Sequence, residues 1–455
     1  DRVLEGRVLR LVIPAALLLG GGGAGLGAGV LAPPPRGGCG HPHSGTIHAG
    51  VSTAIPRRAI HLVGLKRTLG RVSTWLLLGA LPVLIVFAPL AVCFHNGTGA
   101  WALDFNGNFV TPARDILRGV SPYHTAYLEH VRAAVADGRR PDQFSKGVFA
   151  TYPAPALLIG VPFTYLPAAL AEWLWLGAMV ACAAAALRLA GARDWRVYGA
   201  SLLTPAMGTS LAYGTVNCAL MLGLAATWRW RDRAGRAGAA LAALIALKLI
   251  FLPLLAWLVC TRRFAAAAVS CAGAAALGLG GWALIGFHGL GDYPHVLSLL
   301  SDIERRQGFS TVSNALALGL GGRAASIVPY VLGAGVITLL WLAIRRGGPR
   351  ADAHGFLLAM LAMLVLSPIL WLHYLVFLLV PLAVLRPRFG VAWLMPSLLW
   401  ALPFAGYTPA NPLQRIAVIA AILGTVALAI GPRSLLPAFS AQPPSRGGGT
   451  IPEWR

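Results

Sequence analysis

The sequence predicts an all-α protein that crosses a membrane many times. Hydrophobic residues make up 57% of the 455 residues and charged residues only 11%, whereas a soluble globular chain carries about 25% charged residues. Long apolar runs recur along the chain, and the alternating ten-residue strands of an outer-membrane barrel are absent. We therefore expect a polytopic transmembrane helical bundle of about 10–13 spans, at about 20 residues each.

The distribution of basic residues agrees with a membrane topology. The net charge is +22, and the arginines cluster in short loops between apolar runs, as the positive-inside rule expects. Topology therefore explains the charge, and we expect a lipid bilayer and no nucleic acid as partner. The basic loops are Arg188–Arg196, Arg229–Arg236, Arg262–Arg263, Arg345–Arg350 and Arg386–Arg388.

The two ends of the chain differ from its middle. Residues 1–65 are rich in Gly and Pro and lack periodicity, which predicts a low-complexity or disordered extension. A signal peptide around the apolar run Val8–Leu19 is the alternative. The membrane domain is expected at 66–431, followed by a disordered Pro/Gly/Ser-rich tail at 432–455.

Two polar segments interrupt the apolar sequence. Basic residues precede the first clear span, Thr74–Phe94, which places that end in the cytoplasm and the loop 95–150 outside. This first outer loop holds five of the fifteen acidic residues, and PARDILRG and YLEHVRAAVADG have the spacing of short amphipathic helices on a membrane surface. A second outer loop is expected at 288–314.

Two apolar blocks are predicted to be broken helices. The block 152–190 is interrupted near Leu166–Pro167, and residues 237–260 hold Lys248 and Pro253 near their middle. If every basic loop is cytoplasmic, some blocks must turn back halfway. Broken helices are tolerated only where they line a protein or water-filled cavity, so both blocks are candidate cavity walls.

Few ionisable residues lie in or beside the apolar runs, and each needs a reason. Asp104 follows the first span and could act as a general base, or be a solvated loop acid or helix cap. His373 could hold a phosphate, orient a carboxylate or shuttle a proton, or be a neutral core histidine. Lys248 could bind a lipid phosphate or snorkel to an interface.

Polar side chains in the apolar blocks are further candidates. Asn217 could hydrogen-bond a sugar hydroxyl or join two helices. Tyr152 opens the second block, where a belt residue is the ordinary interpretation. There is no GxxxxGK, HExxH, GxSxG or acidic DxD pair, and no CxxC among the six cysteines. We therefore expect no metal and no cofactor.

The order of these pieces resembles a known family. One span is followed by DFNGNFVTPARDILRGVSPYH, then YPAPALLIGVPFTYLPAALAEWLW, a Gly-x-x-Asn at Gly214–Asn217, LKLIFLP and SPILWLHYLVFLLVPL. Over roughly residues 70–430 this resembles glycosyltransferase family 87, of the C-type membrane glycosyltransferases. Its members include polyprenol-phosphate-mannose-dependent α-mannosyltransferases and an arabinofuranosyltransferase.

The resemblance implies an enzyme at the outer face of the plasma membrane. It would pass a sugar, with mannose expected first, from a polyprenyl phosphate to a glycolipid or cell-envelope glycan hydroxyl, with inversion. The family's loop aspartate corresponds to Asp104, and its histidine after Ser-Pro-x-x-Trp corresponds to His373. Two positions depart from the family, because Thr215 replaces a Gln and Leu249 follows Lys248 where a Pro is usual.

Under this interpretation a polyprenyl phosphate is itself a good leaving group, and the donor is a substrate, not a cofactor. The phosphate could be held by Lys248 and His373, with Arg305 and Arg306 as further cations and Tyr374 as a further substrate contact. The alternatives are arabinofuranosyl transfer, a transporter or flippase for a lipid-linked sugar, and a membrane scaffold without chemistry.

Overall fold

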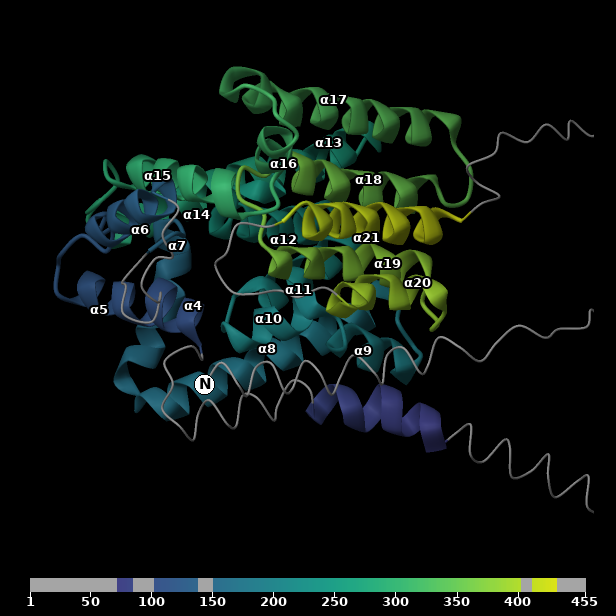
Figure 1. Ribbon diagram of the computed structural model, residues 1–455, viewed down its shortest axis with the longest axis horizontal. Helices are drawn as coiled ribbons and strands as arrows, with labels where there is room; N and C mark the ends of the chain where they lie inside the picture. Colours follow the sequence, from purple (N-terminus) through teal and green to yellow (C-terminus); the bar gives the residue numbers. More distant parts are fainter. Residues whose placement is uncertain (1–71, 85–101, 138–149, 402–410, 432–455) are drawn as a thin grey trace, which may run out of the picture. The chain divides into compact units, whose positions relative to one another are not determined.

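The computed structural model describes residues 72–84, 102–137, 150–401 and 411–431 (Figure 1). The predicted extension 1–65, the tail 432–455 and the second half of the span Thr74–Phe94 lie outside these residues. Every regular element in the described part is a helix, so the all-α prediction is confirmed. The chain divides into two units, Asp1–Leu76 and Leu77–Arg455, and the helical bundle belongs to the second unit.

The apolar helices make this a polytopic helical membrane protein. Four described helices are long and apolar enough to cross a membrane: α8 (Ala168–Ala190), α14 (Phe264–Leu284), α17 (Gly322–Arg346) and α21 (Pro412–Ile430). Six apolar helical segments of 10–17 residues accompany them, and the total of 10–13 spans stays a prediction. They are Val72–Leu84, Ala154–Tyr165, Ala234–Leu247, Leu249–Cys260, Ala351–Leu366 and Leu372–Leu385.

The predicted outer loops are helical. The first holds α4 (Leu103–Phe105), the π-helix η2 (Asn106–Val110), α5 (Thr111–Leu117) and α6 (Ala126–Ala136); the second holds α15 (Tyr293–Gln307) and α16 (Thr311–Ala317). The helices expected in PARDILRG and YLEHVRAAVADG are thus confirmed as α5 and α6. Figure 1 shows α6 beside α15, and the two helices are in contact. Their buried apolar residues include Val131 and Val296.

Both predicted helix breaks are present. The first block forms α7 (Ala154–Leu157) and the 3-10 helix η4 (Leu158–Tyr165), which ends just before α8. The second forms α12 (Ala234–Leu247), η5 (Leu249–Phe251) and α13 (Pro253–Cys260). Between α12 and η5, Lys248 is extended (φ −159°, ψ 111°). Pro253 occupies the first position of α13, where its missing N–H costs nothing.

Eight further elements of the described chain belong to the same helical bundle. They are α9 (Trp195–Leu202), α10 (Pro205–Ala212), α11 (Asn217–Arg229), α18 (Ala351–Leu366), η6 (Leu372–Leu378), α19 (Leu379–Leu385), α20 (Val391–Leu394) and η7 (Met395–Ala401). Helix α18 ends at Leu366, and residues 367–371 are irregular before η6 begins.

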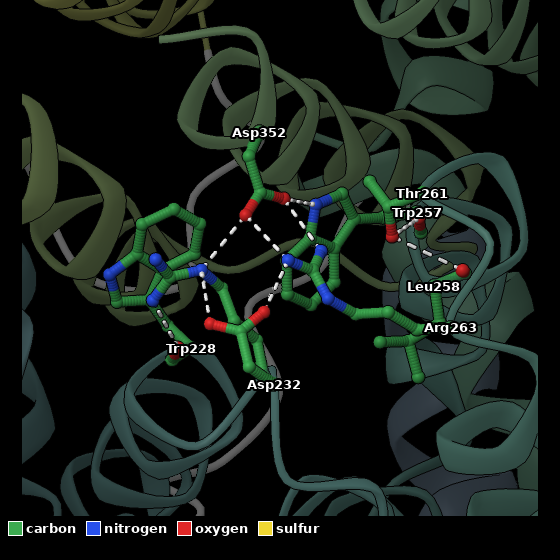
Figure 2. Close-up of polar contacts among 8 residues, drawn as sticks. Trp228, Asp232, Trp257, Leu258, Thr261, Arg263 and Asp352 are labelled. Atoms are coloured by element: carbon green, nitrogen blue, oxygen red, sulfur yellow. Dashed lines mark hydrogen bonds and ion pairs between the residues drawn. The ribbon is translucent and has the colours of Figure 1, made fainter. Parts of the chain in front are cut away.

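A network of ion pairs joins three basic turns (Figure 2). Asp352, in the first turn of α18, accepts hydrogen bonds from Arg231 Nε at 2.8 Å, Arg263 Nη1 at 2.9 Å and Trp257 Nε1 at 2.9 Å. Arg263 also donates to Asp232 at 2.8 Å. The residues around Asp352 therefore come from the turn before α12, the end of α13 and the start of α18.

This network explains one block whose topology the sequence left unresolved. The chain enters α12 beside Arg231 and leaves α13 at Arg263, and both arginines bind Asp352. Helices α12 and α13 therefore start and finish at the same end, with the turn at Lys248. A second link joins two further basic loops, because Asp194 Oδ2 accepts from the Phe389 N–H at 3.1 Å.

Candidate functional site

Asp104 is placed by backbone contacts to the end of α10. The Ala102 N–H donates to the Ala212 carbonyl at 3.0 Å, and the Asp104 N–H donates to the Tyr213 carbonyl at 2.8 Å. Gly214 lies directly against the α4 segment. A Cβ there would lie 2.9 Å from the Phe105 Cβ, and the Gly214 φ of +67° is one that other residues rarely adopt. Gly214 of the Gly-x-x-Asn segment therefore allows the helix that carries Asp104 to pack against the end of α10.

Aromatic packing and hydrogen bonds from α8 support this contact between α4 and the end of α10. The rings of Phe105 and Trp175 stack with centroids 4.7 Å apart, and Trp175 Nε1 donates to the Gly214 carbonyl at 2.7 Å. Two residues after Asp104, Asn106 donates to Glu172 Oε1 at 2.7 Å. Helix α8 supplies both Trp175 and Glu172, so it supports the α4 segment together with the end of α10.

Asn217 fixes the backbone at His373. Its Nδ2 donates to the His373 carbonyl at 3.2 Å, and Ser210 Oγ donates to the same carbonyl at 3.3 Å. The His373 ring lies edge-on to the Tyr213 ring, with centroids 6.5 Å apart. Tyr213 and its neighbour Gly214 therefore contact both the α4 segment and the His373 segment. Of the two roles expected for Asn217, its amide nitrogen performs the helix-joining one.

Lys248 lies between two tyrosine rings. Its Nζ is 3.8 Å from the Tyr374 ring centroid and 5.1 Å from the Tyr152 centroid. Nζ is buried and has no hydrogen-bond partner among the described residues, so the ammonium does not snorkel into solvent. The rings supply cation–π attraction, worth about 2 kcal/mol when desolvated. A buried ammonium without a hydrogen-bond partner in the described part of the chain is suited to receive an anion.

The charges of Asp104 and Lys248 interact. Burial raises the pKa of the Asp104 carboxyl from 3.8 to about 6, and the nearby Lys248 charge opposes part of that rise. His373 and Tyr374 are also within electrostatic range of this pair. The structure therefore gathers Asp104, Tyr152, Lys248, His373 and Tyr374 around one place, with Asn217 behind His373.

Arg305 and Arg306 are placed differently. Both side chains are exposed in the last turn of α15. No hydrogen bond, ion pair or ring contact links either of them to Lys248, His373 or Tyr374 within the described ranges. Their role as phosphate ligands stays a prediction.

Sequence reasoning missed the residues that join the outer loops to this group. The Tyr123 hydroxyl donates to the Tyr152 carbonyl at 3.0 Å, and its ring packs against Tyr293 with centroids 5.2 Å apart. Glu304, on the same helix as Tyr293, is fully buried. One signal was available, because Leu300, Glu304 and Gln307 share the i, i+4, i+7 face of α15.

Comparison with known proteins shows which family and which relative the chain is similar to. Residues 150–368 match the profile of glycosyltransferase family 87. The chain is 28% identical over 291 residues, 56% of its own length and 68% of the relative's, to the polyprenol-phosphate-mannose-dependent alpha-(1-2)-phosphatidylinositol pentamannoside mannosyltransferase of Mycolicibacterium smegmatis. No solved structure matches. The profile covers Tyr152, Asn217 and Lys248, and these matches identify a membrane glycosyltransferase whose residues 150–368 are a family 87 region.

Proposed function

We propose that this enzyme transfers a sugar from a polyprenyl-phosphate carrier to a hydroxyl of a glycolipid or cell-envelope glycan, with inversion. The observation that carries the proposal is the buried Lys248 ammonium, which has no hydrogen-bond partner in the described part of the chain and lies within electrostatic range of Asp104. Such a pair offers a cation for the donor phosphate and a base for the acceptor hydroxyl.

Asp104 acts as the general base. A carboxyl whose pKa is about 6 is ionised at neutral pH and is still basic enough to take a proton as the nucleophile forms. The acceptor oxygen bonds to the anomeric carbon while the bond from that carbon to the phosphate oxygen breaks. The hydroxyl proton goes to Asp104, and the electron pair leaves with the polyprenyl phosphate. One displacement inverts the anomeric configuration.

Lys248 binds the departing phosphate, with His373 and Tyr374 beside it. Charge develops on the phosphate oxygen as the sugar leaves, and a preorganised cation in a dry site stabilises that charge. The Tyr152 and Tyr374 rings hold the ammonium in place before the donor arrives. Arg305 and Arg306, exposed in the last turn of α15, are further cations for the donor phosphate.

Mannose is the sugar to test first. The M. smegmatis relative is described as using polyprenol-phosphate-mannose and a phosphatidylinositol pentamannoside, which supports a mannosyl donor and a mannosylated lipid acceptor here. The basic turns meet at Asp352, and the positive-inside rule favours the cytoplasm for such an end, which supports an outer-face position for the Lys248 turn.

The test is transfer of radiolabel from polyprenyl-phosphate-mannose to membrane glycolipid by purified wild type and Asp104→Asn. We expect product from wild type and at least 100-fold less from the variant, since general-base catalysis supplies about 10²–10⁴-fold. Product only from polyprenyl-phosphate-arabinose would change the sugar and keep the mechanism. Product from neither donor would refute the proposed donor class.

A further inference from the structure

The carboxylate of Glu304 is buried at the join between the second outer loop and the helix break before His373. Its Oε1 accepts hydrogen bonds from the Leu370 N–H at 2.9 Å and the Phe309 N–H at 3.2 Å. The side chain is fully buried, although it lies on an amphipathic helix in a polar loop. Burying a carboxyl costs several kcal/mol unless it makes compensating bonds, so this placement requires a reason.

The broken segment 367–371 needs partners from elsewhere in the chain. Irregular backbone in a membrane protein must have its N–H and C=O groups satisfied by protein or by water in a cavity. Leu370 obtains both bonds from the second outer loop, because its N–H donates to Glu304 and its carbonyl accepts from the Phe309 N–H at 3.1 Å. His373 comes only three residues later, in η6. The loop therefore fixes the stretch of backbone from which His373 and Tyr374 project.

Arg415, on α21, also binds the second outer loop. Its Nη1 donates to the Gly308 carbonyl, Ser313 Oγ and Asn314 Oδ1 at 2.9–3.0 Å. Arg415 is 8% exposed in the first turn of α21, and its charge acts on Glu304. Two buried residues thus hold the turn after α15, Glu304 against the helix break and Arg415 against the last helix.

We propose that Glu304 is a positioning residue of the donor site, which sets His373 and Tyr374 beside Lys248 by tying the second outer loop to Leu370. The expected kinetic effect rests on the proposed function. The contact between Glu304 and Leu370 rests on the geometry alone. It makes the second outer loop part of the catalytic unit. Glu304 touches no reacting group and acts through the backbone at Leu370.

Glutamine is a close mimic of Glu304, so Glu304→Gln tests the hydrogen bonds between this side chain and Leu370. Burial raises the pKa of the Glu304 carboxyl to about 8, against hydrogen bonds from Leu370, Ser310 and Phe309 that lower it. The residue is therefore mostly neutral at pH 7. Glu304→Gln keeps an oxygen that accepts the hydrogen bonds from the Leu370 and Phe309 N–H groups. Glu304→Ala removes that oxygen. The matched control is Asp302→Ala, on the same helix, whose half-exposed carboxylate pairs with Arg132 at 3.7 Å.

The kinetic experiment measures transfer from polyprenyl-phosphate-mannose by wild type and the three variants in detergent at matched folded concentration. We expect Glu304→Ala to lower kcat/KM for the donor by about tenfold or more with the acceptor KM unchanged, Glu304→Gln to stay within about threefold of wild type, and Asp302→Ala to match it. An equal loss in donor and acceptor parameters, or wild-type kinetics in Glu304→Ala, would overturn the positioning role.

Amide hydrogen exchange, measured by mass spectrometry, tests the hydrogen bond between Glu304 and Leu370 without an activity assay. Glu304→Ala should speed exchange in peptides covering 367–376, and Glu304→Gln and Asp302→Ala should not. If wild type transfers from neither donor, the proposed function fails while this exchange result still decides the tie. If Glu304→Ala leaves exchange at 367–376 unchanged, the inference fails whatever the enzyme transfers.

Discussion

The Nζ of Lys248 lies 3.8 Å from the centre of the Tyr374 ring, and no hydrogen bond to any described residue holds it. Lys248 stands at the turn between α12 and η5, and Tyr374 follows His373 in η6. The contact therefore joins two helix breaks that are far apart in the sequence. The Lys248 ammonium contacts aromatic rings and has no hydrogen-bond partner in the described chain. The contribution of Lys248 to stability can therefore be measured separately from its contribution to activity.

Replacing Lys248 by Met should lower activity without lowering stability. The variant keeps a side chain of similar length over the rings and removes a buried charge that lacks a hydrogen-bond partner in the described chain, so the melting temperature should stay the same or rise. The donor phosphate loses its cation, and we expect kcat/KM for the donor to fall at least tenfold. Thermal unfolding and initial rates check both parts. A fall in melting temperature with normal transfer would contradict the assignment.

Replacing Asp104 by Asn should abolish proton removal and leave donor binding intact. We expect kcat to fall about 10²–10⁴-fold with little change in the donor KM. The matched control is Asp115→Asn in the same loop, where the carboxylate contacts the His124 ring nitrogen at 3.0 Å. Initial rates for both variants decide the role. A variant at Asp104 that keeps more than a tenth of wild-type kcat would exclude it as base.

Transfer should decline in acid as Asp104 takes up a proton. Burial raises the pKa of Asp104 to about 6, and the base must be ionised, so kcat/KM should fall about tenfold per pH unit below pH 6 and level off above it. The Lys248 charge lowers that pKa against burial. Its removal in Lys248→Met should therefore move the acid limb to higher pH. Profiles of kcat/KM against pH check the sign, and a shift to lower pH is the result that rules it out.

Gly214→Ala should displace the helix that carries Asp104. The new Cβ would lie 2.9 Å from the Phe105 Cβ, at a φ of +67° that costs Ala about 1–2 kcal/mol. We expect reduced thermal stability and a kcat at least tenfold lower. Gly177→Ala is the matched control, since a Cβ at Gly177 in α8 meets nothing within 4 Å. Comparable losses in both variants would count against a specific contact at Gly214.

Asp352→Ala should weaken the fold and spare the chemistry. The carboxylate accepts bonds from Arg231, Arg263 and Trp257, and a hydrogen bond to a charged group contributes about 1.5–3 kcal/mol. We expect a lower melting temperature with unchanged kcat per folded enzyme. Asp302→Ala breaks an exposed pair worth about 0–1 kcal/mol and serves as control. Loss of kcat in folded Asp352→Ala would mean that the network reaches the site.

The positions of helices and breaks could be predicted because apolar runs and prolines are local signals in the sequence. The breaks at Leu166–Pro167 and Lys248 are where expected, and the cost of burying charge selected Lys248 and Asp104 as candidates. Long-range pairing could not be predicted in this way. Nothing local in the sequence indicates that the Asn217 amide binds the His373 carbonyl, because 156 residues separate them.

Glu304 is a buried ionisable residue that the local sequence does not reveal. An ionisable residue stands out in an apolar run, but Glu304 lies in a polar loop between Ile303 and Arg305. Its burial depends on the packing of α15 against α6 and on the gap between α18 and η6, which is a tertiary property. Arg415 is more visible, since it stands near the start of an apolar span.

The cluster around Asp352 carries a consequence for the order of assembly. Arg231 and Arg263 precede Asp352 by 121 and 89 residues, so during synthesis each arginine emerges long before its acceptor. Until α18 is made, these cations have no Asp352 to bind, and basic loops of this kind favour one side of the membrane during insertion. Once α18 enters the bilayer, the same charges join three turns through a single carboxylate, so that late synthesis of one residue completes the packing of helices inserted much earlier.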